Sequence, residues 1–530
     1  MAGRRRRLGA VWHVLVVLAV ALLATGGLTA RLRLRDHLGL ALGAPRAPSV
    51  HAPGPAGAPA SWVTLENRRP GSRGWRIARP SEPHAIEGFA DHVSAARGDT
   101  VTLYVSTVAP SFRVEAWRMG WYGGAGGRLL WRSGSLRGRR QPKPVRDPDT
   151  NLIEARWRPS LRLSVAADWP PGDYLLKLVA PGAGASYVPL TVRDDTATAA
   201  LVVLNAVTTW QAYNAWGGRN LYWGPAMDFD LRSRVVSFDR PYDAGLGAAD
   251  FLGNELPLVW LAERSGLNVT YSTDVDLHRH PERLAAQRAL LSLGHDEYWS
   301  TRMRRGVEQA RDQGVNLAFL GANAIFRHIR LAPSPLGPDR REVNYKPAGA
   351  RADPAWRTDK HEVTTDWREP PLNQPESAVL GEQYECNPAR ADGVVADPGS
   401  WLLAGTGLAR GAHLPNLVGP EYDRVAPDTP TPATVRLVLH SPLRCRGHRS
   451  FSDVTYYTAP SGAGVVDTGT SSWICQLAAA CGQGRSNPAT RVAVQRITLN
   501  LLRAFALGPA GLAHPARSNL PAFDLRPSGL

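Results

Sequence analysis

The chain contains 530 residues, with 62 lysines and arginines against 46 aspartates and glutamates, and its formal net charge at pH 7 is +16. A basic protein can bind nucleic acid or anionic surfaces, but the arginines here are scattered among acidic residues and form no basic stripe with interleaved aromatic side chains. The composition therefore argues against a nucleic-acid partner, and we expect none. A chain of this length exceeds the usual size of one domain and predicts several.

The N-terminus predicts a membrane anchor. Residues 4–7 are four arginines, and residues 8–28 contain no aspartate, glutamate, lysine or arginine. Since about 20 apolar residues suffice to cross a membrane, residues 1–35 are predicted to be a basic N-terminus and a signal-anchor helix, with the remaining chain outside the cytoplasm. The alternative is a cleaved signal peptide and secretion. Residues 36–60, rich in alanine, proline and glycine, predict a tether.

The cysteines agree with export. All four lie in the last third of the chain, an even number without the spacing of a zinc or redox site, and outside the cytoplasm this pattern favours two disulfides. Three pairings are open. We favour Cys386–Cys445 and Cys475–Cys481, because the second closes a short local loop.

Residues 61–195 predict a β-domain. Short runs of alternating apolar and polar residues lie between glycines and prolines, as at residues 100–106, 112–118 and 174–179. Period-two alternation with turn residues between the runs is typical of an antiparallel β-sandwich. We expect an immunoglobulin-like sandwich here.

Residues 196–510 predict an α/β domain, followed by a C-terminal tail at 511–530. Continuous apolar runs predict strands that are buried on both faces, and segments of helical spacing alternate with them. The strands are expected at 199–205, 268–271, 289–294 and 315–320, and the helices at 251–266, 283–288, 300–313 and 496–505. This alternation predicts a doubly wound parallel sheet, whose functional loops lie at the carboxyl ends of the strands.

Unusual residues gather at three of these predicted strand ends, in residues 210–222, 294–300 and 321–323. The middle segment, Gly-His-Asp-Glu-Tyr-Trp-Ser, is the most informative because it places several functional side chains in one turn. A structural interpretation stays open: Ser300 would cap a helix and the two acids would favour its positive end. The glycines and aromatic residues of 210–222 could likewise form a tight turn and a core.

Several mechanisms are excluded by the sequence. No cysteine precedes Cys386, and the patterns GxSxG and HExxH are absent, which excludes a cysteine–histidine nucleophile at the sheet edge, a nucleophile elbow and that zinc site. His278 and His280 could bind a metal by composition, but a solvated loop explains them better. The remaining chemistry belongs to oxygen donors.

Several segments together resemble a known family. They are residues 213–218 (YNAWGG), 237–242 (SFDRPY), 274–278 (DVDLH), 294–299 (GHDEYW) and 321–323 (GAN). They resemble the family that holds the large subunit of N,N-dimethylformamidase, an amidohydrolase, and the resemblance runs from about residue 200 to 502. Residues 118–124 (RMGWYGG) are similar to the module that often precedes this domain in exported actinobacterial members.

The resemblance implies a fold like that of class I glutamine amidotransferases without the cysteine triad, and a mononuclear iron held by two tyrosines and a glutamate. It places Tyr298 on one metal-binding tyrosine and Glu362 on the glutamate, and leaves Tyr213 and Tyr222 as candidates for the second tyrosine. Phenolate and carboxylate oxygens suit Fe(III).

The other expected roles follow from the same segments. His295, Asp296 and Glu297 are expected to move protons, and Asn214, Trp216 and Asn323 to contact the substrate.

These observations predict an exported, membrane-tethered hydrolase that uses iron to cleave an amide or a related C–N bond. Its substrate would be a small amide or a cell-envelope molecule, and a homo-oligomer or a small partner subunit stays open. The alternative function is a non-catalytic binding module for the cell envelope, on a degenerate form of the same fold.

Overall fold

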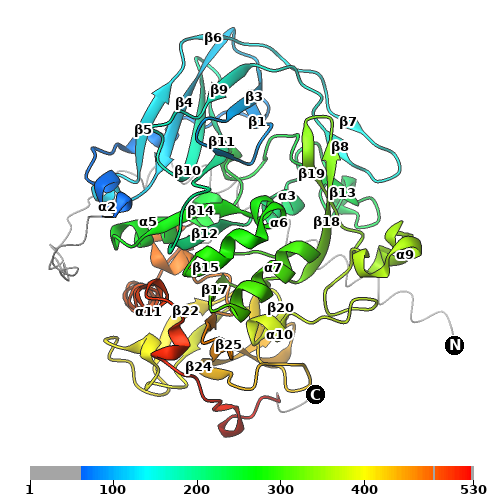
Figure 1. Ribbon diagram of the computed structural model, residues 1–530. Helices are drawn as coiled ribbons and strands as arrows, with labels where there is room; N and C mark the ends of the chain where they lie inside the picture. The colour runs from blue at the N-terminus through cyan, green and yellow to red at the C-terminus, as the bar shows by residue number, and fades with distance from the viewer. Residues whose placement is uncertain (1–60, 482–483, 527–530) are drawn as a thin grey trace. The chain divides into compact units, whose positions relative to one another are not determined.

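The structure is a computed structural model that describes residues 61–481 and 484–526. The elements discussed below belong to one compact unit, Ala60–Pro225 and Phe229–Leu530. A β-rich part comes first, and a part with helices on both sides of a large sheet follows it (Figure 1). The predicted boundaries between the domains stay predictions.

The β-rich part contains two sheets that share one apolar core. The smaller sheet has the order β1-β3-β9 and the larger one has the main path β2-β11-β10-β4-β5. Their strands are β1 (Ile86–Ala90), β2 (Ser94–Ala96), β3 (Thr100–Thr107), β4 (Ser111–Met119), β5 (Gly127–Arg132), β9 (Leu161–Ser164), β10 (Gly172–Ala180) and β11 (Gly184–Arg193). Side chains from both sheets, including Val101, Val114 and Leu178, are buried together, as expected for strands with one apolar face.

A seven-stranded sheet forms the centre of the second part. Its order is β14-β12-β15-β17-β26-β25-β24. The strands are β12 (Leu201–Asn205), β14 (Val269–Thr273), β15 (Ala289–Gly294), β17 (Asn316–Gly321), β24 (Arg436–Cys445), β25 (His448–Thr458) and β26 (Gly464–Asp467). The pairings from β14 to β26 are parallel, and the last two are antiparallel.

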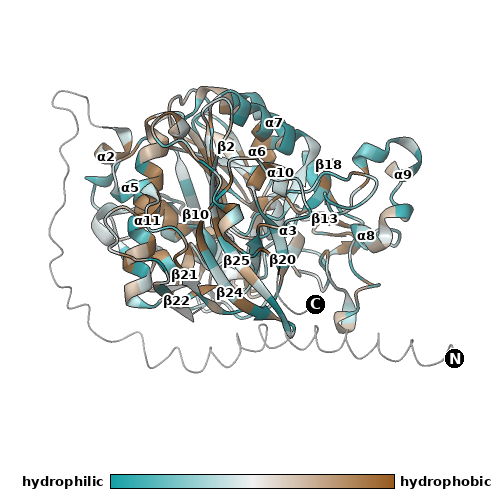
Figure 2. Ribbon diagram, turned by 90° about the horizontal axis from the view of Figure 1, so that it is seen from below, coloured by the Kyte–Doolittle hydropathy of each residue, from teal (hydrophilic) through white to brown (hydrophobic). Residues whose placement is uncertain are grey.

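Both faces of this sheet are covered because its strands are apolar on both sides. The described α-helices discussed below are α3 (Val207–Tyr213), α4 (Phe251–Asn254), α5 (Leu256–Arg264), α6 (Asp274–Arg279), α7 (Thr301–Asp312) and α11 (Pro488–Ala506). Val203 and Leu291 face a core that includes side chains of α5 and α11. Their neighbours Val202 and Leu290 face the other core, with side chains of α6 and α7. In Figure 2, α7 is largely teal on its outer side, whereas α11 and α5 are largely brown.

The predicted doubly wound parallel sheet, with its likeness to the glutamine amidotransferase fold, is wrong. After β17 the chain does not return through a helix to another parallel strand. It enters the sheet again through the hairpin β24–β25, which turns at Arg446 and Gly447, both with positive φ. Strands joined by a tight turn can only be antiparallel, so the sheet is mixed. The β-rich part also departs from the purely antiparallel prediction, because β2 pairs with β11 in parallel.

A four-stranded sheet that the sequence analysis did not predict lies beside the large sheet, in the order β13-β19-β18-β16. Its strands are β13 (Val235–Ser237), β16 (Tyr298–Ser300), β18 (Arg327–Ser334) and β19 (Gly337–Val343). Strand β16 pairs in parallel with β18 and begins four residues after β15 ends. The His-Asp-Glu segment therefore connects the two sheets.

The structure also bears on the predicted membrane anchor. Among residues 61–481 and 484–526, no helix combines the length and the apolar character needed to cross a membrane, which contradicts the predicted transmembrane character and single-pass membrane localisation. Residues 8–28, which the prediction concerned, lie outside the described residues.

One disulfide joins β20 (Gln383–Cys386) to the end of β24. It links Cys386 to Cys445, with the two Cα atoms 6.4 Å apart. Cys475 is also disulfide-bonded, but the side chain of Cys481 lies outside the described part of the chain. The Cys475–Cys481 pairing therefore stays a prediction.

Candidate active site

The site is built on the turn after β15. Gly294 ends this strand with φ +63°, and a Cβ there would lie 2.6 Å from the carbonyl oxygen of Asn254, so only glycine fits. The turn brings Glu297 inward, where its side chain is fully buried. Its backbone N–H donates to Oγ1 of Thr209 at 2.8 Å, which fixes the turn to α3.

Two tyrosines meet this buried glutamate. The Tyr213 hydroxyl donates to Oε2 of Glu297 at 2.7 Å, and the Tyr222 hydroxyl lies 2.6 Å from Oε1 and 2.9 Å from Oε2. The two hydroxyls are 2.9 Å apart and their rings stack. We call Tyr213, Tyr222 and Glu297 the tyrosine–glutamate cluster. Both tyrosine side chains are partly exposed, so a molecule from solvent can reach them.

The cluster keeps its phenols neutral. Burial, together with the charge of Glu297, raises the pKa of Tyr213 and of Tyr222 well above the ordinary value. Desolvation disfavours a charged phenolate, and a neighbouring carboxylate disfavours it further. Each hydroxyl therefore acts as a hydrogen-bond donor to Glu297 unless a cation offsets the charge.

Two basic side chains of the chain adjoin the cluster. Arg327, on β18, lies with Nε 3.0 Å from Oε1 of Glu297 and also pairs with Asp366. Lys346 is buried, donates through Nζ to the Tyr298 hydroxyl at 2.8 Å and lies 3.6 Å from the ring centre of Tyr222. Burial and the charge of Arg327 lower the pKa of Lys346 well below the ordinary value.

A histidine–glutamate pair also adjoins Glu297. His295 Nε2 is 3.2 Å from Oε2 of Glu421 and 3.5 Å from Oε2 of Glu297. Burial alone would lower the pKa of His295, but the charges of Glu421 and Glu297 outweigh it and raise that pKa to about 10. Asn323 and Asn387 each donate a side-chain N–H to Glu421, which stabilises its charged form. His295 is therefore an imidazolium at neutral pH.

Asp296 points into the protein. Ser292 donates to its Oδ2 at 2.7 Å, and the Trp299 indole donates to its Oδ1 at 2.9 Å. Burial raises the pKa of Asp296 to about 7. The structural interpretation of Ser300 is confirmed, since its hydroxyl accepts from the Met303 N–H and caps α7.

The structure separates the other predicted site residues. Tyr298 is buried next to the cluster and holds Lys346, whereas the Glu362 carboxylate accepts from Thr301 and has no described contact with the cluster. Asn214 donates to the Pro241 carbonyl, and buried Trp216 donates to Glu87 of the β-rich part. Asn323 lies beside His295 and Glu421. The functional roles assigned to all of these residues stay predictions.

Sequence reasoning missed three ionisable members of the site, Arg327, Lys346 and Glu421. Lys346 carried one signal, since the chain has only four lysines. Its backbone φ of 59° is also uncommon for a non-glycine residue and marks a constrained position. Glu421 follows the cis peptide Gly419–Pro420 and lies far along the chain from the motif that it joins.

The geometry of the site by itself indicates the class of protein. A buried carboxylate, two phenols and an imidazolium converge at the end of a parallel strand, and these groups are the ones that hydrolases use to move protons and polarise substrates. The family described as N,N-dimethylformamidase beta subunit-like, C-terminal, matches residues 113–487. The chain belongs to this family. The match runs from β4 to the residue that caps α11, and in coarse terms it indicates a dimethylformamidase-like hydrolase. A comparison with curated proteins finds no match.

Proposed function

We propose that this protein hydrolyses the C–N bond of a small amide at the tyrosine–glutamate cluster, with an iron ion held by Tyr213, Tyr222 and Glu297. The family supports the hydrolase class. One observation carries the assignment to these residues: two phenol oxygens and one carboxylate lie within 2.6–2.9 Å of one another at the end of β15.

The donor set fits such an ion. Phenolate and carboxylate are hard oxygen donors, which suit Fe(III), and the partial exposure of both tyrosines leaves an approach from solvent. The metal ligands proposed here differ from those expected from the sequence. Glu297 replaces Glu362, whose carboxylate is engaged by Thr301, and Tyr298 becomes a neighbour, because its hydroxyl receives Lys346.

When bound, the iron would polarise the amide carbonyl and lower the pKa of water. The chain's own residues would do the rest. Arg327 orients Glu297, and Asp366 in turn fixes Arg327. His295, kept protonated by Glu421, faces the same Glu297 oxygen that accepts from Tyr213. It can give a proton to the departing amine, which a neutral leaving group requires.

Metal content and the visible spectrum of the purified full-length chain test the proposal. We expect near-stoichiometric iron after iron-replete expression, with a tyrosinate-to-iron band, and hydrolysis of members of a panel of small amides. Tyr213→Phe and Glu297→Gln each remove one oxygen donor or its charge. Both should lose the iron and lower kcat/KM by at least about a hundredfold.

Matched controls separate this loss from general damage. Tyr104→Phe changes a buried tyrosine that stacks on Phe89 in the β-rich part, and Glu82→Gln changes an exposed glutamate. Both should keep the iron and the activity. A chain that binds no iron in any preparation would sink the iron assignment. A chain that binds amides without turning them over would instead support the binding-module alternative.

A further inference from the structure

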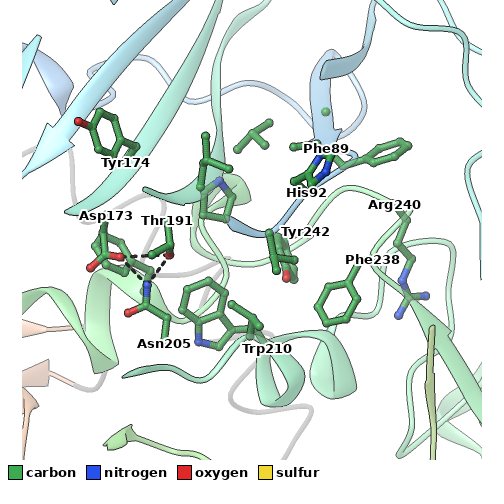
Figure 3. Close-up of a pocket in the computed structure, with 18 residues that line it drawn as sticks. Phe89, His92, Asp173, Tyr174, Thr191, Asn205, Trp210, Phe238, Arg240 and Tyr242 are labelled. Atoms are coloured by element: carbon green, nitrogen blue, oxygen red, sulfur yellow. Dashed lines mark hydrogen bonds between the residues drawn. The ribbon is translucent and has the colours of Figure 1, made fainter. Parts of the chain in front are cut away.

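A cavity lies away from the tyrosine–glutamate cluster, between the β-rich part and the large sheet (Figure 3). Its volume is about 30 Å³. Since a cavity of about 10–15 Å³ on this measure already holds a water molecule, there is space for about two non-hydrogen atoms. Strands β1, β10 and β11 form one wall, and β12, α3 and the segment after β13 form the other.

One end of this cavity is polar and has unused acceptors. Asn205 donates through Nδ2 to Oδ1 of Asp173 at 2.5 Å and to Oγ1 of Thr191 at 2.8 Å. The three side chains lie together at one end of the cavity in Figure 3. Within the described residues, Oδ2 of Asp173 and Oδ1 of Asn205 have no hydrogen-bond partner, although both side chains are more than nine-tenths buried. An unsatisfied buried acceptor is costly, which indicates a ligand that donates hydrogen bonds.

The remaining wall is mainly aromatic and aliphatic. Trp210, Tyr242 and Phe238 line the cavity beyond the polar end (Figure 3), and aromatic faces attract organic cations. The positive side chain in the lining, Arg240, is already used, because its guanidinium donates to the carbonyls of Asn214, Trp216 and Arg219. His92 pairs with Asp91.

Carboxyl groups surround the polar end. The charge of Arg118 lowers the pKa of Asp173 and that of Glu263 raises it, while the charge of Asp173 raises the pKa of Glu255. Burial raises the pKa of Asp173 to about 7, so a bound cation would return this carboxyl to its charged form. Two unpartnered oxygens are too few for a metal ion, and no group of three histidine, cysteine or acidic residues in the described chain is placed to hold one.

We propose that this cavity binds a small protonated amine, ammonium or methylammonium, whose N–H groups donate to Asp173 and Asn205 while its carbon side contacts the aromatic wall. The site does not depend on the proposed hydrolase function. It is joined to the cluster through α3, because Val207 and Trp210 line the cavity and Tyr213 ends the same helix. If amides are the substrates, the released amine is a ligand of this class.

Equilibrium dialysis of radiolabelled methylammonium against the purified full-length chain tests the proposal. We expect saturable binding of one equivalent, competition by ammonium, and no competition by potassium or tetramethylammonium at equal ionic strength. Asp173→Asn keeps the shape but removes the charge, and it should weaken binding at least about tenfold, which corresponds to about 1.4 kcal/mol. The matched control Asp168→Asn changes an exposed aspartate and should bind like the wild type.

The proposal is overturned if the wild-type chain shows no saturable binding, since the cavity would then hold water only. It is also overturned if potassium competes as well as ammonium, or if a folded Asp173→Asn variant binds normally. Circular dichroism establishes whether that variant is folded. If the variant is not folded, the competition by ammonium and by potassium on the wild-type chain still shows whether the cavity selects a protonated amine. The same binding measurement on the Tyr213→Phe variant, which should lose the iron and the activity, shows whether amine binding is independent of the proposed hydrolase function.

Discussion

The hydroxyl of Tyr222 contacts both oxygens of Glu297, at 2.6 Å and 2.9 Å, across 75 residues of sequence. Glu297 is fully buried, so its charge depends on this phenol, on Tyr213 and on Arg327. A buried carboxylate without such partners would be expensive. The two phenols that stabilise the buried Glu297 carboxylate are therefore the same groups that would bind a metal ion together with it.

Tyr222→Phe should lose the bound iron while leaving the protein folded. The change removes one oxygen donor and two contacts to Glu297 but keeps the ring that stacks on Tyr213. We expect the visible band to disappear and the free energy of unfolding to fall by about 1–3 kcal/mol. Elemental analysis and urea unfolding measure the two effects. A variant that keeps stoichiometric iron would show that Tyr222 is not a ligand.

Arg327→Met should destabilise the protein by about 3–5 kcal/mol, because removing one member of a buried charge network leaves Glu297 and Asp366 uncompensated. Arg113→Met is the control. Arg113 is partly exposed and pairs with Glu115, so its loss should cost at most about 1 kcal/mol. Equal losses of stability in urea unfolding would show that the Arg327 network contributes no more than a surface ion pair.

Glu421→Gln should lower the pKa of His295 from about 10 toward the ordinary value of 6.5. The charge of Glu421 is the largest contribution that raises this pKa, and the glutamine keeps the shape of the side chain. Histidine NMR titration, with a His295→Gln variant to assign the resonance, measures the shift. If activity needs the imidazolium, the alkaline limb of the pH–rate profile moves to lower pH by the same amount. An unchanged pKa would contradict the pairing.

The protein should become less stable as pH rises from about 4 to 8 because of Asp423. This carboxyl is fully buried, burial raises its pKa to about 8, and the folded state therefore holds a proton that the unfolded state has lost. Its contribution is complete below the unfolded pKa and is lost as pH rises through the folded pKa, with a slope of up to about 1.4 kcal/mol per pH unit. Asp423→Asn should flatten this slope and Asp168→Asn should not, as followed by urea unfolding at several pH values.

Cys386→Ser with Cys445→Ser should lower the free energy of unfolding by about 4 kcal/mol, because the bond closes a loop of 59 residues and restricts the unfolded chain. Reduction of the wild-type chain should have a similar effect. A reduced chain as stable as the oxidised one would show that this bond contributes nothing to stability. Denaturant unfolding with and without reductant makes the comparison.

Local patterns in the sequence predicted the local elements well. The apolar runs at 199–205, 289–294 and 315–320 correspond to β12, β15 and β17, and the helix expected at 300–313 corresponds to α7, capped by Ser300. The predicted helix 251–266 is broken at Glu255. The carboxylate of this residue accepts hydrogen bonds from the Trp210 indole and the Ala206 N–H. Periodicity reports burial along one segment, and it does not report such distant partners.

The strand direction and the site depended on contacts between distant segments. The hairpin β24–β25 carries strand-like residues, but only its pairing with β26 decides that the sheet is mixed. Likewise, Glu297 lies within a motif that the sequence shows. The other charged or basic members of the site lie 30 or more positions further along the chain and join it only in the folded structure: Arg327, Lys346 and Glu421. No periodic signal connects such positions.

The sequence by itself determined the family, the buried strands and the motif that carries Glu297, because these depend on residue type and on short-range spacing. Only the tertiary structure decided which oxygens meet. It joined Tyr213 and Tyr222 to Glu297, and it placed Glu362 elsewhere. The physical reason is that a buried charge selects its partners in three dimensions, by desolvation and hydrogen bonding across the whole fold.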